Sequence, residues 1–324
     1  MANIVDILTI QPTVVSRDLQ GKFLLIYGQP KVGKTSFAAK MPQNLMCAFE
    51  VGTNALSGVM AVNIDKWTTF KSIIRQLRNP AAKEKYKTIT IDTVGIAYSL
   101  CEEYICTQQG VNSIGEIPYG GGYGMVEREF SNCLRQITQE GYGMIIIAHS
   151  AERVEKNAQG NEVTMVAPDI PKRGYKVINQ LVDIIGYIGI KTNDKGEVER
   201  CLVTRQTPTI MAGSRFKYLP RVIPFGYKEL TDAITEAVER AAKEDGEVVV
   251  THSTTEPVGE SKSFQEMKED ARKLWEELMV NPENLTKMSK IIQSIFGRPV
   301  KLSEVPESQK DLFELVLTEL EQLK

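Results

Sequence analysis

One eight-residue pattern constrains the fold of this chain more than any other feature. The run at 28–35 reads G-x-x-x-x-G-K-T; with the next residue it comprises Gly28, Gln29, Pro30, Lys31, Val32, Gly33, Lys34, Thr35 and Ser36. A short apolar, β-prone run at 23–27 precedes it, and a helix-prone run at 36–40 follows it. A glycine-rich turn between a strand and a helix points backbone N–H groups at an anion. The pattern therefore predicts a phosphate-binding loop, and the alternative is an ordinary connection that binds nothing.

The residue types in this loop suit distinct tasks in binding a magnesium nucleotide. Gly28 and Gly33 permit backbone conformations and close approaches that a side chain would block. Lys34 is expected to bind the β- and γ-phosphates as a point charge. The Thr35 hydroxyl is expected to be a ligand of Mg²⁺. The pattern is that of a P-loop, so ATP and Mg²⁺ are the expected cofactors.

Composition argues against several classes of protein. The chain has 39 Lys and Arg against 41 Asp and Glu, a formal net charge of −2. That balance argues against a strongly basic nucleic-acid coat protein, but not against a local basic groove. The five cysteines lack C-x-x-C spacing, and two histidines are too few for a histidine-rich metal site. No secretory leader or membrane-length apolar run is visible, so we expect a cytoplasmic protein without a membrane partner.

Strand-like and helix-like runs alternate after the loop. The expected strands are 45–49, 88–91 and 144–148, and the expected helices are 67–78, 94–108, 127–140 and 227–242. This alternation predicts an α/β fold, with a mostly parallel sheet flanked by helices on both faces. A β-hairpin is expected at 184–190 and 198–204, around a turn at 192–196.

Composition also predicts where the domains end. We expect an N-terminal arm at 1–20, a nucleotide-binding core at 21–244, a polar linker at 245–263 and a small helical module at 264–324. Apolar residues recur at helical spacing in the last segment, as expected for three packed helices. Within the linker, the apolar run 248–250 is a candidate for pairing with a neighbouring strand.

Three polar side chains end predicted strands, where the carboxyl edge of a parallel sheet binds ligands. Asp92 is predicted to contact Mg²⁺ through water, and a helix N-cap is the competing role. Glu50 is predicted to orient the water that attacks the γ-phosphate, unless it is a solvated strand-end residue. His149 is predicted to sense the γ-phosphate, and a structural histidine is the alternative.

Phosphoryl transfer also needs a cation that stabilises charge in the transition state. Arg205 follows the second strand of the expected hairpin, and Arg215 lies in a nearby loop. Either arginine is a candidate to enter the site of an adjacent subunit, and the alternative for each is a surface charge.

Two long segments are candidates for contact with a polynucleotide. The glycine-rich stretch 110–124 carries Tyr119 and Tyr123, whose aromatic faces can stack on unpaired bases. The polar stretch 150–172 and the residue after it carry cations that can neutralise phosphates, namely Arg153, Lys156, Lys172 and Arg173. Long loops in compact domains are uncommon unless they are functional or disordered. We therefore predict binding of single-stranded DNA, with ordinary flexible loops as the alternative.

The order of these features resembles the RecA-type recombinase core. More narrowly, it resembles the short phage-encoded RecA-like ATPases, some of which act in single-strand annealing recombination. The resemblance covers roughly 11–242, and its most specific parts are 27–36 and 90–93. It implies that Glu50 is the catalytic glutamate, that His149 occupies the position of a polar allosteric sensor, and that Arg205 reaches across a subunit interface. It also implies that 110–124 and 150–172 are DNA-facing loops.

Three functions follow as hypotheses. The first is an ATP-dependent protein of phage recombination or replication that binds and anneals single-stranded DNA. It would act as a homo-oligomer, a ring or a filament, with DNA-stimulated hydrolysis of ATP at the subunit interfaces. The second is an ATP-gated loader that recruits a helicase or single-strand-binding protein through its C-terminal helices. The third is a small-molecule kinase, for which the sequence has no additional acceptor signature.

Overall fold

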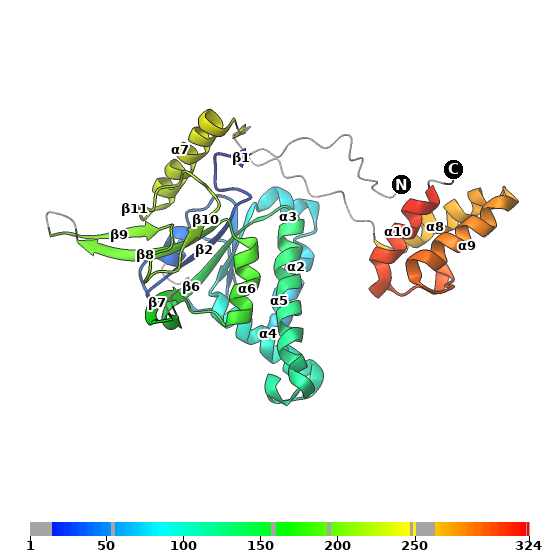
Figure 1. The fold of residues 1–324 in the computed structure, drawn as a ribbon, viewed down its shortest axis with the longest axis horizontal. Helices are drawn as coiled ribbons and strands as arrows, with labels where there is room; N and C mark the ends of the chain where they lie inside the picture. The colour runs from blue at the N-terminus through cyan, green and yellow to red at the C-terminus, as the bar shows by residue number, and fades with distance from the viewer. Residues whose placement is uncertain are drawn as a thin grey trace. The chain divides into compact units, whose positions relative to one another are not determined.

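The computed structural model describes residues 15–52, 56–156, 160–192, 196–246, 249–250, 263–321 and 323. These residues divide into two compact units, 15–250 and 263–323 (Figure 1). Most of the expected arm 1–20 and most of the expected linker 245–263 lie outside the described residues. The boundaries expected from the sequence therefore stay predictions.

The larger unit is built on a mixed sheet with a parallel centre. In the described part of the chain its strand order is β11-β9-β8-β2-β6-β5-β3-β4. In addition, β7 pairs with β6, and β10 pairs with β8. The strands are β2 (Phe23–Gly28), β3 (Asn44–Ala48), β4 (Ala61–Asn63), β5 (Thr88–Asp92), β6 (Gly143–Lys156), β7 (Glu162–Pro168), β8 (Ile184–Thr192), β9 (Val198–Val203), β10 (Gly213–Ser214) and β11 (Val222–Pro224). Strands β4, β3, β5, β6, β2 and β8 are parallel, β9 is antiparallel to β8, and β11 is antiparallel to β9. The predicted mostly parallel sheet is confirmed.

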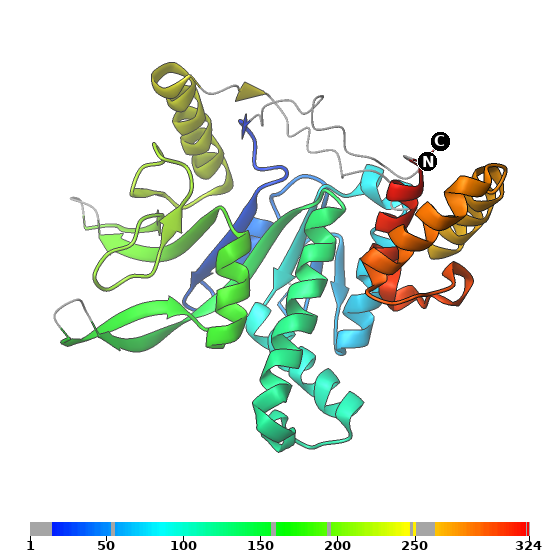
Figure 2. The ribbon, with the colours of Figure 1, turned by 45° about the vertical axis from the view of Figure 1, so that its right-hand side comes forward.

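Helices cover both faces of the sheet (Figure 2). They are α1 (Lys34–Ala38), α2 (Trp67–Gln76), α3 (Pro80–Lys85), α4 (Val94–Gln109), α5 (Gly121–Gln139), α6 (Lys172–Leu181) and α7 (Tyr227–Asp245). Strand β2 is buried on both sides because its alternate residues enter two cores. Leu25 and Tyr27 pack in the core of α2, α4, α5 and α6, whereas Leu24 and Ile26 pack in the core of α1 and α7. This burial fixes the position of the loop that follows β2.

The segment expected to be a glycine-rich loop at 110–124 is mostly helical. Two 3-10 turns, η2 (Ile114–Glu116) and η3 (Pro118–Gly120), lead into α5 at Gly121, so the helix expected from 127 begins six residues earlier. Ile114 and Ile117 of this segment are buried in the core, and Gly122 packs closely against Ile117, whose Cδ1 would lie 2.7 Å from a Cβ at that position. Figures 1 and 2 show the α4–α5 pair extending beyond the sheet.

The second expected loop, 150–172, is mainly a β-hairpin. Strand β6 continues past the sheet and pairs with antiparallel β7 from Ser150 opposite Pro168 to Lys156 opposite Glu162. The hairpin expected at 184–204 forms from β8 and β9, and part of its turn, 193–195, lies outside the described residues. The apolar run 248–250 does contribute a strand, since β12 (Val249–Val250) pairs in parallel with β1 (Val15–Ser16).

The smaller unit is helical, as predicted. It contains α8 (Phe264–Leu278), α9 (Pro282–Phe296), α10 (Lys310–Glu321) and the 3-10 turns η4 (Leu302–Glu304) and η5 (Glu307–Gln309). Its core is formed by residues such as Leu274, Met288 and Phe313. A capping box begins α8: the Ser263 side chain accepts from the Glu266 N–H, and the Glu266 carboxylate accepts from the Ser263 N–H.

Candidate nucleotide site

The loop between β2 and α1 has the backbone conformation that its glycines predict. Gly33 has φ 105° and Lys31 has φ 62°, both in the left-handed region. A Cβ on Gly33 would also lie 2.6 Å from a guanidinium nitrogen of Arg200. At Gly28, a Cβ would meet Ile188 at 3.2 Å. A side chain at Gly33 would therefore suffer both backbone strain and a collision, and one at Gly28 would be crowded.

Lys34 is held inside this loop. Its Nζ donates to the carbonyl oxygens of Gly28 at 2.9 Å and Gln29 at 2.8 Å, and the residue is 6% exposed. Burial lowers the pKa of Lys34, while Asp92 and Glu50 act to raise it. Phosphate oxygens would provide the strong anionic partners that two neutral carbonyls do not.

Thr35 and Asp92 meet at the carboxyl edge of the sheet. The Thr35 hydroxyl donates to Asp92 Oδ2 at 2.7 Å, although β5 is separated from β2 by β6. Burial raises the pKa of Asp92, opposed by the Thr35 hydrogen bond and the Lys34 charge. Asp92 does not cap the next helix, because the N-cap residue of α4 is Thr93. The predicted role of Asp92 at Mg²⁺ stays a prediction.

This pair fits a magnesium ion of the kind that P-loop proteins hold. A hydroxyl and a carboxylate are hard oxygen ligands, and Mg²⁺ is commonly bound by one or two protein ligands together with substrate phosphates. Among the described residues, no group of three or more His, Cys, Asp or Glu side chains could hold a metal alone. Thr35 and Asp92 are therefore the residues that would hold Mg²⁺ together with the nucleotide.

Glu50 and His149 form a second pair at the same edge. His149 Nε2 and Glu50 Oε2 are 3.1 Å apart, and their side chains are 33% and 45% exposed. The backbone N–H groups of Phe49 and Glu50 donate to the Asp92 carbonyl, which places Glu50 beside Asp92. His149 lies opposite Gly28 in the β2–β6 register. The structure thus brings Glu50 and His149 together near the loop, as the sequence led us to expect.

The two arginines predicted to act across an interface lie away from the loop of their own chain. The Arg205 guanidinium donates to the carbonyls of Ser214, Phe216 and Lys217. Arg215 pairs with Asp183 at 3.1 Å, and Asp183 also accepts from the N–H of Phe23 at the amino end of β2. Their action in a neighbouring subunit stays a prediction.

Arg200 is the arginine that the sequence reasoning missed. Its Nη1 donates to the Val32 carbonyl at 3.0 Å, and its guanidinium lies 5.6 Å from the centre of the Phe225 ring. Because β9 runs antiparallel to β8, Arg200 lies opposite Ile190, well towards the carboxyl edge. The register of the expected hairpin could have located Arg200. In a strand that runs antiparallel to β8, the first residues lie at the carboxyl edge of the parallel strands.

The residues predicted to contact DNA have different surroundings. Tyr119 is fully exposed on η3, and Tyr123 is 45% exposed on α5. The Arg173 guanidinium lies 5.7 Å from the Tyr123 ring centre and pairs with Glu127 at 2.9 Å. Arg153 instead donates to the carbonyls of Pro168 and Ile170 at the base of the β6–β7 hairpin.

The two remaining cations predicted to contact DNA are lysines. Lys172 is exposed at the start of α6, and the Lys156 side chain is outside the described part. Tyr123 and Arg173 are therefore the pair that the fold assembles from the two segments.

Comparison with known proteins gives consistent matches. A family model described as an AAA domain matches residues 20–216. The SPbeta prophage-derived uncharacterized protein YorG of Bacillus subtilis is 30% identical over 333 residues, covering 98% of each chain.

Two solved structures are more distant. A KaiC-like protein of Pyrococcus horikoshii has a TM-score of 0.38 and 12% identity, over 65% of this chain and 88% of that one. The flagellar accessory protein FlaH of Methanocaldococcus jannaschii has a TM-score of 0.34 and 13% identity, over 64% and 85%. Among the described residues, no helix has both the length and the apolar character needed to span a bilayer.

Proposed function

Because this chain belongs to the AAA domain family of P-loop ATPases, we propose that it hydrolyses ATP to control binding and annealing of single-stranded DNA. The proposed setting is phage recombination or replication in the host cytoplasm. The name of the prophage-derived relative supports that setting. The observation that carries the ATPase proposal is the 2.7 Å contact of Thr35 with Asp92, next to the Glu50–His149 pair.

The residues at this edge divide the work of hydrolysis. Lys34 and the backbone N–H groups of the loop would bind the phosphates. Thr35 and Asp92 would hold Mg²⁺, whose charge would offset negative charge on the phosphate oxygens. Glu50 accepts a hydrogen bond from the attacking water and orients it toward the γ-phosphate. His149 holds the Glu50 carboxylate in place through the 3.1 Å contact. Phosphoryl transfer is mainly positioning and charge stabilisation, which these residue types supply.

The protein is proposed to act as a homo-oligomer, a ring or a filament. Arg200 donates to the Val32 carbonyl of the loop, so a second cation at the γ-phosphate, in addition to Lys34, would come from another copy of the chain. Arg205 and Arg215 are the candidates. The half-exposed Glu50 and His149 leave the site open to such a neighbour. A cation supplied in this way would link hydrolysis to contact between subunits.

DNA binding is proposed for the protruding α4–α5 region. Tyr119 and Tyr123 offer exposed aromatic faces to unpaired bases, and Arg173 supplies charge beside Tyr123. Lys172 is exposed one residue before Arg173, and Lys156 belongs to the neighbouring hairpin. Because α4 begins two residues after Asp92, a change at the nucleotide has a short route to this region.

Fluorescence anisotropy with labelled single-stranded oligonucleotides tests the DNA proposal. We expect tighter binding with a non-hydrolysable ATP analogue than without it, and phosphate release that rises when oligonucleotide is added. Absence of oligonucleotide binding at low salt, with and without the analogue, would contradict it. Phosphate transferred to a small-molecule acceptor instead of water would support a kinase.

A groove in the smaller unit favours a second candidate, the ATP-gated loader. The groove has a volume of about 670 Å³ and lies beside α8, with apolar walls that include Trp275, Val300 and Leu302. Such a surface suits the apolar side chains of a helicase or single-strand-binding protein. Deletion of residues 263–324 separates the two candidates: loss of partner capture with intact DNA binding would favour the loader.

A further inference from the structure

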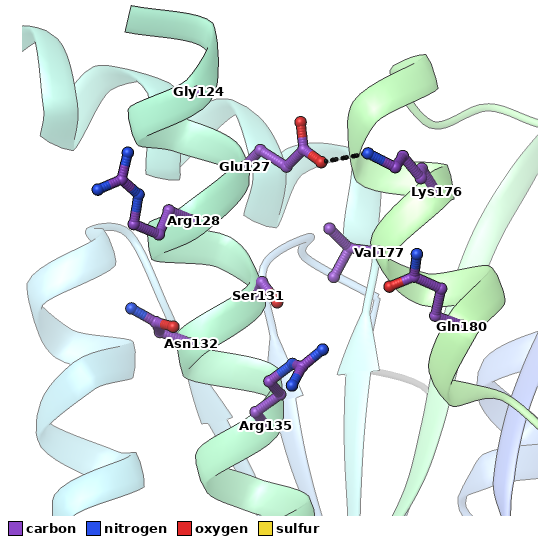
Figure 3. A pocket seen from close by; sticks show the side chains of 9 residues that line it. All are labelled: Gly124, Glu127, Arg128, Ser131, Asn132, Arg135, Lys176, Val177 and Gln180. Atoms are coloured by element: carbon purple, nitrogen blue, oxygen red, sulfur yellow. Dashed lines mark hydrogen bonds and ion pairs between the residues drawn. The ribbon is translucent and has the colours of Figure 1, made fainter. Parts of the chain in front are cut away.

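A polar groove lies between α5 and α6, apart from the nucleotide loop (Figure 3). It has a volume of about 380 Å³ and is open to solvent. The side chains that matter here are Arg128, Ser131, Asn132 and Arg135 from α5, and Lys176 and Gln180 from α6. Apart from Glu127, every charged side chain that lines the groove in the described part of the chain is a cation.

Helix geometry aligns the groove residues of α5 in one row. Arg128, Ser131, Asn132 and Arg135 follow the spacing i, i+3, i+4 and i+7, which keeps them on one face. The opposite face is fixed in the core by residues such as Phe130 and Ile137, which are fully buried. At 1.5 Å per residue, the two arginines are about 10 Å apart along the helix axis. That separation exceeds the size of a single phosphate group and suits an extended ligand.

The charges along this row are not neutralised internally. Arg128 and Arg135 are exposed, and neither guanidinium has a hydrogen bond or ion pair with another described residue. Glu127 is shared between Lys176 at 3.0 Å and Arg173 at 2.9 Å. The groove is thus lined by one carboxylate and three cations, Arg128, Arg135 and Lys176, and the neutral side chains Ser131, Asn132 and Gln180 also line it. This combination suits a ligand with several phosphates and sugar oxygens.

We propose that the α5–α6 groove binds the sugar-phosphate backbone of single-stranded nucleic acid. The proposal rests on the proposed function and identifies where the strand runs. Arg128 and Arg135 bind separate phosphates through their planar guanidinium groups. Arg173 pairs with Glu127 of the groove and lies near the Tyr123 ring, so bases stack on Tyr123 while the backbone follows α5.

The salt dependence of oligonucleotide binding tests this path. The full-length Arg128→Ala/Arg135→Ala variant is compared with wild type and with Arg75→Ala/Arg221→Ala, which removes the same charge from exposed arginines outside the groove. Single-strand affinity falls with log salt by about 0.7 per neutralised phosphate. We expect the slope of the groove variant to be shallower by about 1.4, with affinity at least about tenfold weaker at low salt. The control is expected to keep the wild-type slope.

A second variant distinguishes the contribution of the two positive charges from that of the planar guanidinium groups. Arg128→Lys/Arg135→Lys keeps both charges, so it is expected to restore the slope and only part of the affinity. Melting temperatures establish that the variants are folded. If wild type binds and the Ala variant keeps the wild-type slope, the groove proposal fails and the proposed function stands. If wild type binds inorganic phosphate but no oligonucleotide, both fail.

Discussion

At the scale of single residues, the charge of Asp92 is expected to serve Mg²⁺ binding while lowering the stability of the nucleotide-free protein. Burial raises the pKa of Asp92, so the folded chain loses stability as the pH rises through that pKa and the carboxyl group ionises. Asp92→Asn keeps an acceptor for Thr35 without the charge. We expect it to raise the melting temperature of nucleotide-free protein at pH 7 by about 2–4 °C, the effect of about 1 kcal/mol. The gain is expected to shrink toward pH 4, and calorimetry at both pH values measures it.

The same substitution removes the charge of the proposed Mg²⁺ ligand. Asp92→Asn is therefore expected to lose the additional thermal stabilisation that magnesium and ATP give to wild type. A variant that is no more stable than wild type at pH 7, and is still stabilised by magnesium and ATP, would contradict this role for Asp92.

Glu50 is predicted to affect hydrolysis rather than binding. Glu50→Gln keeps the size of the side chain but is a poor acceptor for a water proton, so we expect phosphate release to fall about 10²–10⁴-fold. The affinity for ATP is expected to stay close to wild type, as measured by nucleotide titration. His149→Ala should slow release less, since the role proposed for His149 is to hold Glu50 in place. Hydrolysis at the wild-type rate in Glu50→Gln would exclude the carboxylate as the group that orients water.

Some site residues were predictable from the sequence and others were not. Asp92, Glu50 and His149 follow or end apolar runs, and the ends of parallel strands meet at one edge. Arg200 was missed because it lies inside a strand, and its approach to Val32 depends on hairpin register. The surroundings of Arg153 and Arg205 depend on long-range contacts with backbone carbonyls, which residue type alone does not indicate.

At the scale of elements, the early start of α5 depends on close packing at Gly122. Gly122→Ala would place a Cβ 2.7 Å from Ile117 Cδ1 and 2.8 Å from the Ile114 carbonyl. We expect this variant to be destabilised by about 1–3 kcal/mol. Gly124→Ala is the matched control, because its Cβ meets nothing within 4 Å and alanine favours helix. Thermal unfolding should shift down for the first and up for the second; shifts of the same sign would contradict the packing.

Some of these elements could be predicted from the sequence and others could not. Buried strands such as β2 and β5 are compact apolar or β-branched runs, so both were expected at nearly the observed bounds. The glycines at 120–124 suggested a loop, since glycine disfavours helix. Burial of Ile114 and Ile117 against this turn overrides that preference. The β6–β7 hairpin was missed because the part of β6 that pairs with β7, residues 150–156, is mostly polar or charged in sequence.

At the scale of the whole molecule, the α/β unit holds the nucleotide residues and the proposed DNA path, and the helical unit has a groove of its own. From the sequence, a division was expected at a polar stretch between two patterns of periodicity, and its boundaries stay predictions. The number of subunits in an oligomer could not be predicted from the sequence, because it depends on contacts with the surfaces of other copies. Arg205 and Arg215 have a role in hydrolysis only if they enter the nucleotide site of an adjacent subunit.

Titration calorimetry of wild type and Lys34→Ala with magnesium-bound ATP is the most direct test of the nucleotide site. Lys34 is held between Gly28 and Gln29 beside the Thr35–Asp92 pair, and its charge is expected to bind the β- and γ-phosphates. Wild type should bind one nucleotide per chain, and Lys34→Ala at least about 100-fold more weakly, the effect of about 2.7 kcal/mol. No measurable binding to wild type, or equal affinity in both proteins, would contradict the assignment of this loop as the nucleotide site.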